Sequence, residues 1–163
     1  MTDEIHFEIR VFEPSDATAV ARMRDRSIRQ IAPRGYGPAQ IDAWAGRTRD
    51  VDGFCARMMD GRLALVAVDQ ASAPLGLIDL EADGHIDMLY SAPEAAGRGV
   101  AAALFERVEA TALYNSYARL HTEASELARP FFLKQGFEVL ERRDFEIDGV
   151  PIHNYKMEKR LGD

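Results

Sequence analysis

Cysteine and long hydrophobic runs are both scarce in this sequence of 163 residues. The one cysteine, Cys55, excludes an intramolecular disulfide and favours a reducing compartment. It lies in a segment with a helical pattern, residues 51–59, where a free thiol is usually a small core side chain. No hydrophobic run approaches the length of about 20 residues that spans a bilayer, and the acidic residues 1–4 lack the pattern of a signal peptide. These absences predict a cytoplasmic protein that does not insert into membranes.

Positive charge is also in short supply. The chain has 20 Lys and Arg residues against 27 Asp and Glu residues, which gives a formal net charge of −7. This balance disfavours nonspecific binding to nucleic acid or to an anionic membrane, and it suits an amine substrate. With 47% hydrophobic and 29% charged residues, the composition is that of a globular protein. The length fits one domain over residues 1–163.

Alternating and helical hydrophobic patterns predict an α+β fold. The Asp-Gly pairs at 83–84 and 148–149 are typical of hairpin turns. Between these hairpins, one strand leads through a helix into another strand, and such a crossover makes its two strands parallel. The expected elements are strand 7–12, a helix from residue 14, a short helix around 41–44, strands 63–68, 75–80 and 85–91, helix 100–114, strand 119–123, a helix containing 127–132, and strands 137–147 and 150–157.

The most informative stretch is the junction between strand 85–91 and helix 100–114. It is rich in glycine and alanine and contains Gly97-Arg98-Gly99-Val100-Ala101-Ala102. Small residues let the main chain approach a ligand closely, and the free N–H groups at a helix N-terminus face outward with the positive end of the helix dipole. The junction therefore predicts a phosphate or pyrophosphate site.

A dinucleotide-binding fingerprint is the strongest alternative interpretation of the same residues. Gly97, Gly99 and Ala102 have its spacing, and Glu123 ends the following strand, where an acid would bind a ribose. Two features argue against it. Dinucleotide folds repeat βαβ units, whereas hairpins flank this one, and residues 91–96 intervene where the fingerprint needs an almost immediate turn.

Two correctly spaced segments resemble motifs of the GNAT superfamily of N-acetyltransferases. Residues 89–93 read Leu-Tyr-Ser-Ala-Pro and lead into the glycine loop at 97–101, as in motif A of that family. Residues 125–137 hold a phenylalanine pair followed by Gly-Phe, as in the second motif. Segments 36–45, 86–89 and 129–132 are similar to the YafP-like subgroup. The resemblance implies a mixed, mostly antiparallel central sheet of about six to seven strands flanked by about four helices.

The same resemblance implies an activity and a cofactor. Members of the family transfer acetyl from acetyl-CoA to a primary amine of a small molecule or peptide, by direct attack and without a covalent intermediate. By analogy, the main chain of Leu89 and Tyr90 would bind the pantetheine, and the amides of residues 97–102 would bind the pyrophosphate. The Leu89 N–H would face the thioester oxygen, where it can stabilise the developing oxyanion.

Three positions depart from the family pattern. Ala96 stands where a Gln or Arg usually begins the loop, and Ser125 stands where an asparagine often contacts pantetheine. Phe132 occupies the place of the tyrosine that often protonates the departing CoA thiolate. Phenylalanine cannot donate a proton, so either another residue or water must do so.

The candidate catalytic residues are His85, Asp87 and Tyr155. His85, Asp87 and Leu89 would share one face of an unbroken strand, since strand side chains alternate. His85 can accept a proton near neutral pH, although a place beside a turn also fits an exposed residue. Asp87 could act as a base, bind the substrate ammonium or make a structural hydrogen bond. Tyr155, on the last strand, could replace the missing acid or simply pack there.

The remaining candidates concern the acceptor and the surroundings of the site. Trp44 and Tyr36 could stack on a substrate or cage a cation, or pack in the core. Glu123 is a second possible base. No spacing in the sequence predicts a metal site, so none is expected. A non-catalytic CoA-binding or amine-binding regulatory module on the same fold is the alternative function, and exposed strand edges at the final hairpin are compatible with a homodimer.

Overall fold

The computed structural model describes residues 4–162. Within them the chain forms eight strands and five α-helices, with four short 3₁₀ turns between them. In order, these are β1 (Glu8–Val11), α1 (Ala17–Ile31), α2 (Pro38–Gly46), α3 (Val51–Met58), β2 (Leu63–Val68), β3 (Pro74–Leu80), β4 (His85–Ile86), β5 (Leu89–Ser91), α4 (Val100–Tyr114), β6 (Arg119–Ala124), α5 (Arg129–Lys134), β7 (Glu138–Ile147) and β8 (Val150–Arg160).

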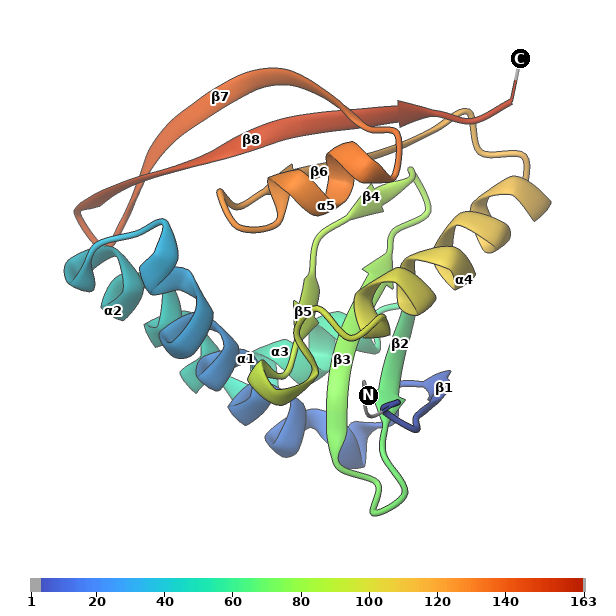
Figure 1. The fold of residues 1–163 in the computed structure, drawn as a ribbon, viewed down its shortest axis with the longest axis horizontal. Helices are drawn as coiled ribbons and strands as arrows, with labels where there is room; N and C mark the ends of the chain where they lie inside the picture. Colours follow the sequence, from blue (N-terminus) through green and yellow to red (C-terminus); the bar gives the residue numbers. More distant parts are fainter. Residues whose placement is uncertain (1–3, 163) are drawn as a thin grey trace.

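The strands form two four-stranded sheets, one ordered β1-β2-β3-β5 and the other β4-β6-β8-β7. Every pairing is antiparallel except that of β4 with β6, the two strands joined through α4. The predicted α+β class, the mixed and mostly antiparallel pairing and the parallel crossover are thus confirmed. Figure 1 shows the second sheet lying across one end of the molecule, with the long β7–β8 hairpin reaching over to α2.

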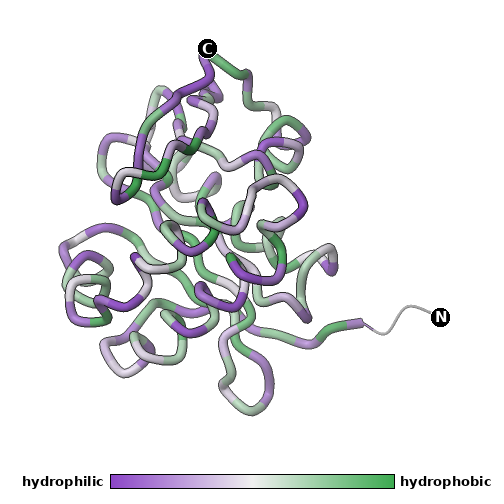
Figure 2. The backbone as a smooth tube through the Cα atoms, turned by 90° about the vertical axis from the view of Figure 1, so that its left-hand side faces the viewer, coloured by the Kyte–Doolittle hydropathy of each residue, from purple (hydrophilic) through white to green (hydrophobic). Residues whose placement is uncertain are grey.

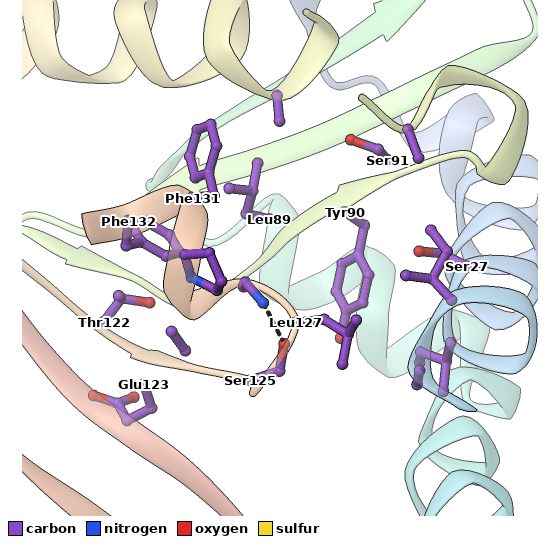
Figure 3. Close-up of a pocket in the computed structure, with 18 of the residues that line it drawn as sticks. Ser27, Leu89, Tyr90, Ser91, Thr122, Glu123, Ser125, Leu127, Phe131 and Phe132 are labelled. Carbon is purple, nitrogen blue, oxygen red and sulfur yellow. Dashed lines mark hydrogen bonds between the residues drawn. The ribbon is translucent and has the colours of Figure 1, made fainter. Parts of the chain in front are cut away.

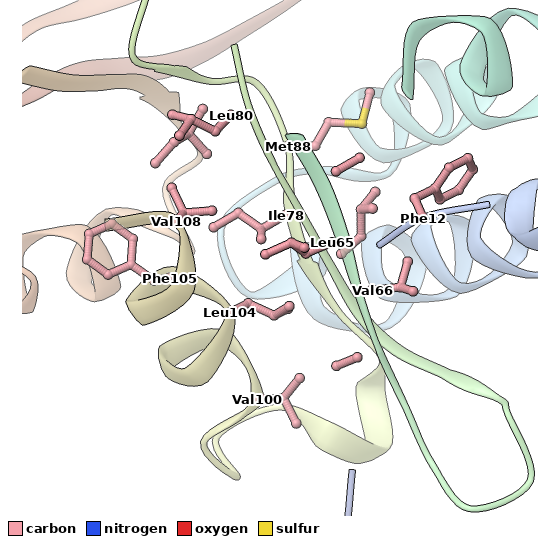
Figure 4. Close-up of a cluster of buried hydrophobic side chains, with 14 of the residues drawn as sticks. Phe12, Leu65, Val66, Ile78, Leu80, Met88, Val100, Leu104, Phe105 and Val108 are labelled. Carbon is pink, nitrogen blue, oxygen red and sulfur yellow. The ribbon is translucent and has the colours of Figure 1, made fainter. Parts of the chain in front are cut away.

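The first sheet is covered on both faces (Figure 4). Val100, Leu104 and Val108 recur along α4 at helical spacing and pack against one face of β2 and β3. On the other face, α1 and α3 pack with Phe12 and Met88. Because both faces are buried, β2 and β3 consist of nearly continuous apolar residues.

Turns form at both Asp-Gly pairs, but the pair at 148–149 joins two strands that pair with each other, whereas the pair at 83–84 joins β3 to β4, which lie in different sheets. Asp148 and Gly149 have φ angles of 50° and 80°, as a type I′ turn requires, and Ile147 pairs with Val150 across the turn. Gly84 has a φ angle of 91°, and a Cβ there would lie 2.2 Å from the Arg119 carbonyl oxygen. Only glycine therefore lets this turn pack against β6.

The expected single strand over residues 85–91 is wrong, because the chain leaves one sheet for the other at Asp87 and Met88. The cause is Asp79, a fully buried side chain one residue before the end of β3. Its Oδ1 accepts hydrogen bonds from the main-chain N–H groups of Asp87 (2.9 Å) and Met88 (2.8 Å). These two groups thus find their partner in a side chain and need no neighbouring strand.

Two further contacts complete this break between β4 and β5. Thr122 on β6 donates its hydroxyl to the Ile86 carbonyl oxygen (2.7 Å). Arg62, at the start of β2, donates from Nη1 to the second oxygen of Asp79 (2.7 Å). Burial raises the pKa of Asp79 to about 6, although the hydrogen bonds that it accepts from Met88 N and from Arg62 lower the pKa. The main-chain groups at the break therefore have hydrogen-bond partners, which come from β3 and β6.

Hydrophobic residues are distributed along the described part of the backbone in short segments and form no long continuous run there (Figure 2). Figure 2 shows short hydrophobic segments separated by hydrophilic ones. Among residues 4–162, no helix is both long enough and apolar enough to cross a membrane.

Candidate active site

The break leaves β5 and β6 as neighbours that do not pair. β4 pairs with β6 only at His85–His121 and Ile86–Thr122, while β5 pairs with β3. Figure 1 shows the two strands diverging from this point. Residues 89–91 and 123–125 therefore face each other across a gap.

Register shows which main-chain groups face the gap. Asp79 N donates to Met88 O (3.2 Å) and Ala92 N donates to Leu75 O (2.9 Å), and hydrogen-bonded pairs alternate along an antiparallel ladder. Tyr90 therefore turns its main chain toward β3. Leu89 and Ser91 direct theirs away from β3, at the edge of the sheet.

A first cavity of about 400 Å³ occupies this gap (Figure 3). One wall is β5, the opposite wall is the end of β6, and the phenylalanine pair of α5 lies between them. Six residues of the predicted cofactor site line it: Leu89, Tyr90, Gly97, Ala101, Ser125 and Phe132. Ser125 also accepts a hydrogen bond from Ala128 N (3.1 Å), which shapes the turn before α5.

The glycine loop lies at one end of this cavity. Gly97 and Gly99 have φ angles of 74° and 91°, and a Cβ on either would meet no atom within 4 Å. Both glycines are therefore required by backbone conformation and not by space. In the helix that follows, the first N–H with a partner is that of Ala103, which donates to Gly99 O (3.1 Å). The N–H groups of residues 100–102 precede it and have no partner within the helix.

The other loop residues of the predicted set do not line the cavity. Arg98 and Ala102 are exposed beside it, and Val100 is buried against β3. Arg98 donates to the Glu94 carbonyl oxygen (3.4 Å). These residues thus belong to the loop and the first turn of α4 without lining the cavity.

A second cavity of about 670 Å³ lies on the far side of Tyr90. It is bounded by α1, α2, α3 and the hairpin, and it contains four arginines as well as aromatic side chains. Five residues line both cavities, namely Trp44, Asp87, Tyr90, Glu123 and Ser125. Two carboxylates therefore stand where the cavities meet.

His85 lines neither cavity. Its Nδ1 is hydrogen-bonded to Glu81, and its Nε2 lies 2.8 Å from Glu123 Oε1. The bonds with Glu123 and Glu81 raise the pKa of His85 to about 9, although burial opposes the shift. His85 is thus held between two carboxylates, and its hydrogen bond lowers the pKa of Glu123.

His85 and Glu123, together with His121, form a cluster of three groups that could hold a metal. His85, His121 and Glu123 each bring one ligand atom within 4.8 Å of the others, and the two imidazole rings stack at 4.9 Å. The sequence did not predict this cluster, because the pairing of β4 with β6 brings positions 36 residues apart side by side. Both ring nitrogens of His85 already bind carboxylates, one of Glu81 and one of Glu123. Ion pairs therefore explain why these side chains lie together.

Tyr155 also lies outside both cavities. Its hydroxyl donates to Glu126 Oε2 (2.8 Å), and this bond raises the pKa of the phenol. His153 Nε2 lies 2.7 Å from the same oxygen. The Tyr155 hydroxyl is therefore hydrogen-bonded to Glu126, which lies in the segment before α5.

The two aromatic residues predicted for the acceptor side do line the second cavity. Trp44 donates from Nε1 to the Tyr90 hydroxyl (3.2 Å), and its ring lies edge-on to Tyr36 at 5.6 Å. The Tyr36 hydroxyl donates to His153 O (2.9 Å) and accepts from Glu126 N (2.8 Å). Two hydrogen bonds thus hold the Tyr36 side chain in the lining of the second cavity, whereas Trp44 lines both cavities.

Sequence reasoning missed Asp79 and Arg24. Asp79 carried a usable signal, since an acid in the apolar segment 75–80 needs a buried partner. Arg24 carried none, because an arginine in an amphipathic helix is normally exposed.

A splayed strand pair beside a glycine loop at a helix N-terminus agrees with a family match. The model described as "Acetyltransferase (GNAT) domain" matches residues 34–159, and the chain belongs to this family. The uncharacterized N-acetyltransferase YafP of Escherichia coli strain K12 is 29% identical over 152 residues, which cover 93% of this chain and 95% of that protein. This match confirms the YafP-like resemblance.

Solved structures agree with the fold. The crystal structure of a GCN5-related N-acetyltransferase from Rhodopseudomonas palustris, described as "Aminotransferase, Class-II", has a TM-score of 0.90, 32% identity and 99% coverage of both chains. PaiA N-acetyltransferase from Thermoplasma acidophilum, solved in complex with coenzyme A, has a TM-score of 0.77 and 18% identity. It covers 96% of this chain and 100% of that one.

Proposed function

We propose that this chain transfers an acetyl group from acetyl-CoA to a primary amine. The observation that carries the proposal is the gap between β5 and β6, where the main chain of Leu89 and Ser91 is free beside the glycine loop. A thin ligand with amide groups at one end and a pyrophosphate at the other matches this arrangement, and the coenzyme A complex of the PaiA relative supports it.

Each part of the cofactor has a matching group. Of the amides of residues 97–102 expected at the pyrophosphate, those of residues 100–102 have no partner within the helix and would bind it, whereas the Arg98 N–H already donates to Ala95 O. The main chain of β5 would bind the pantetheine, and the sequence expectation of Leu89 and Tyr90 becomes Leu89 and Ser91 because Tyr90 turns its main chain to β3. Ser125 and Phe132 would line the opposite wall.

The reaction needs a base at the junction of the cavities. An ammonium substrate must lose a proton before its nitrogen can attack the thioester carbon, and the carbon–sulfur bond then breaks. Asp87 and Glu123 both line the junction, so we assign proton acceptance to this pair. His85 would position Glu123 through its 2.8 Å bond. The Leu89 N–H would stabilise the oxyanion.

The thiolate also needs a proton. Phe132 has none to give, and Tyr155 is bound to Glu126 outside both cavities. We propose that water supplies it. Replacing Tyr155 with Phe tests this point, since a catalytic phenol would lower kcat, whereas an engaged one would change mainly stability.

Calorimetric titration with acetyl-CoA, and with NADH as the control, is the first test. Saturable binding of acetyl-CoA alone, followed by release of free thiol when amines are added, is the expected result. Binding without turnover against any amine would favour the regulatory module, and binding of NADH would favour a dinucleotide site.

A further inference from the structure

Arg24 is a buried cation without an anionic partner. It lies on α1 with 6% of its surface exposed. Its guanidinium carbon is 4.8 Å from the centroid of the Phe54 ring and 5.1 Å from that of Tyr90. Nε is buried with no hydrogen-bond partner, and within residues 4–162 no carboxylate forms an ion pair with this side chain.

Arg62, whose side chain is also nearly buried, shows what is missing. The side chain of Arg62 is 8% exposed, and it forms ion pairs with Asp60 at 2.9 Å and with Asp79 at 2.7 Å. A buried charge is expensive unless it is paired and hydrogen-bonded. Aromatic faces stabilise a cation but leave its N–H groups unsatisfied. The protein supplies anions for Arg62 and none for Arg24, so the partner of Arg24 must come from outside the chain.

The position of Arg24 shows where such a partner would lie. Arg24 lines the second cavity and not the first. Asp87 and Glu123 line both cavities and therefore stand at the junction. The second cavity thus has two carboxylates where it meets the first, a third acid, Asp50, in its own lining, and a buried guanidinium that lines this cavity alone and stacks on Tyr90.

We propose that the acceptor is an amine that also carries a carboxylate, and that Arg24 binds this carboxylate. The inference rests on the proposed function, because it assigns the junction to the reacting amine. Guanidinium and carboxylate match in geometry through paired N–H···O bonds. A carboxylate carries a single charge, which one buried guanidinium balances. A phosphate monoester carries closer to two, and of the cavity's other arginines, Arg47 and Arg57 are exposed and Arg143 is half-buried and donates to Asn154.

The test compares matched acceptors at saturating acetyl-CoA. Each proteinogenic amino acid is assayed for thiol release beside its decarboxylated amine and its carboxamide. We expect the carboxylate-bearing member to have the higher kcat/KM. In the variant Arg24→Gln, KM for that member should rise about 10- to 150-fold, which is the range for losing a hydrogen bond to a charged group. The dissociation constant of acetyl-CoA should stay unchanged.

Two variants separate a binding role from a structural one. Arg24→Lys keeps the positive charge but lacks the paired N–H groups of a guanidinium. It should therefore recover part of the kcat/KM preference for the carboxylate-bearing acceptor. Arg47→Gln removes an exposed arginine from the same cavity and should keep the preference, because an exposed charge is screened by solvent.

Each outcome bears on one claim. Equal activity toward amines with and without the carboxylate, an unchanged preference in Arg24→Gln, or a screen in which no carboxylate-bearing amine is acetylated would overturn the subsite. Failure of the wild type to bind acetyl-CoA would instead count against the proposed function itself.

Discussion

Asp79 Oδ1 lies 2.8 Å from Met88 N, and this bond replaces the strand partner that Met88 would otherwise need. The variant Asp79→Ala leaves Arg62 without a buried partner and two N–H groups unsatisfied. We expect a loss of about 3–5 kcal/mol in the free energy of unfolding. Chemical denaturation measures it. Asp60→Ala, which removes a more exposed partner of the same arginine, should cost much less. Equal losses in the two variants would contradict the role of Asp79.

The pKa of Asp79 makes a second prediction. Burial raises this pKa from its ordinary value of 3.8 to about 6, so the folded state favours the protonated form. The stabilisation that comes from protonating Asp79 in the folded state is therefore fully present below pH 4 and is lost as the pH rises toward 6, while the bonds to Arg62, Asp87 and Met88 continue to contribute. The difference in unfolding free energy between the wild type and Asp79→Asn should fall over this window and then level off.

Asp16 provides a control of opposite sign for that measurement. Its hydrogen bond with Arg10 lowers its pKa. The corresponding difference for Asp16→Asn should therefore decrease as the pH falls below 4. Parallel slopes for the two aspartates would contradict the assignment.

The glycine loop is tested by Gly99→Val. A Cβ at Gly99 would meet no atom, but a φ angle of 91° strains any β-branched residue. We expect the first turn of α4 to shift and calorimetric binding of acetyl-CoA to be lost. Gly61→Val is the matched control, since Gly61 has a φ angle of 107°, also meets no atom, and lines neither cavity. Similar loss of binding in both variants would mean that strain alone explains the result.

The junction carboxylates should affect turnover more than binding. Glu123→Gln and Asp87→Asn remove proton acceptors while they preserve shape. We expect kcat to fall about 10²- to 10⁴-fold in whichever variant loses the base, with little change in the dissociation constant of acetyl-CoA. Steady-state kinetics beside calorimetry separates the two quantities. Full activity in both variants would exclude this pair.

Arg24 makes a prediction about stability that is independent of activity. Replacing a buried, unpaired ion by an apolar side chain of similar length removes a desolvation penalty. The variant Arg24→Met should therefore be at least as stable as the wild type in thermal unfolding. Arg62→Met, in which the buried Asp79 and the more exposed Asp60 lose their partner, should be clearly less stable. A large loss in Arg24→Met would show that the guanidinium is part of the core.

Local chemistry made much of the fold predictable. The Asp148-Gly149 pair, the helical spacing of Val100, Leu104 and Val108, and the glycine loop are features of neighbouring residues. The break at Asp87 could not be predicted in this way, because a side chain eight positions earlier causes it. The expected face shared by His85 and Leu89 depended on an unbroken strand and failed for that reason.

The residues predicted for the cofactor, such as Gly97 and Ser125, come from two contiguous segments of the sequence and line the first cavity, whereas the second cavity is lined from α1, α2, α3 and the hairpin. The burial of Arg24 depends on Phe54 and Tyr90, which are distant in sequence. Periodicity alone gives no sign of such a contact.

The hydroxyl of Tyr36 joins His153, 117 residues away, to Glu126, 90 residues away. Contacts of such long sequence separation join distant parts of the chain, so the second cavity has its complete lining only when β8 is in place. A chain truncated before β8 should therefore lose the wall formed by Ile152, His153 and Asn154 while it keeps the segment of the glycine loop.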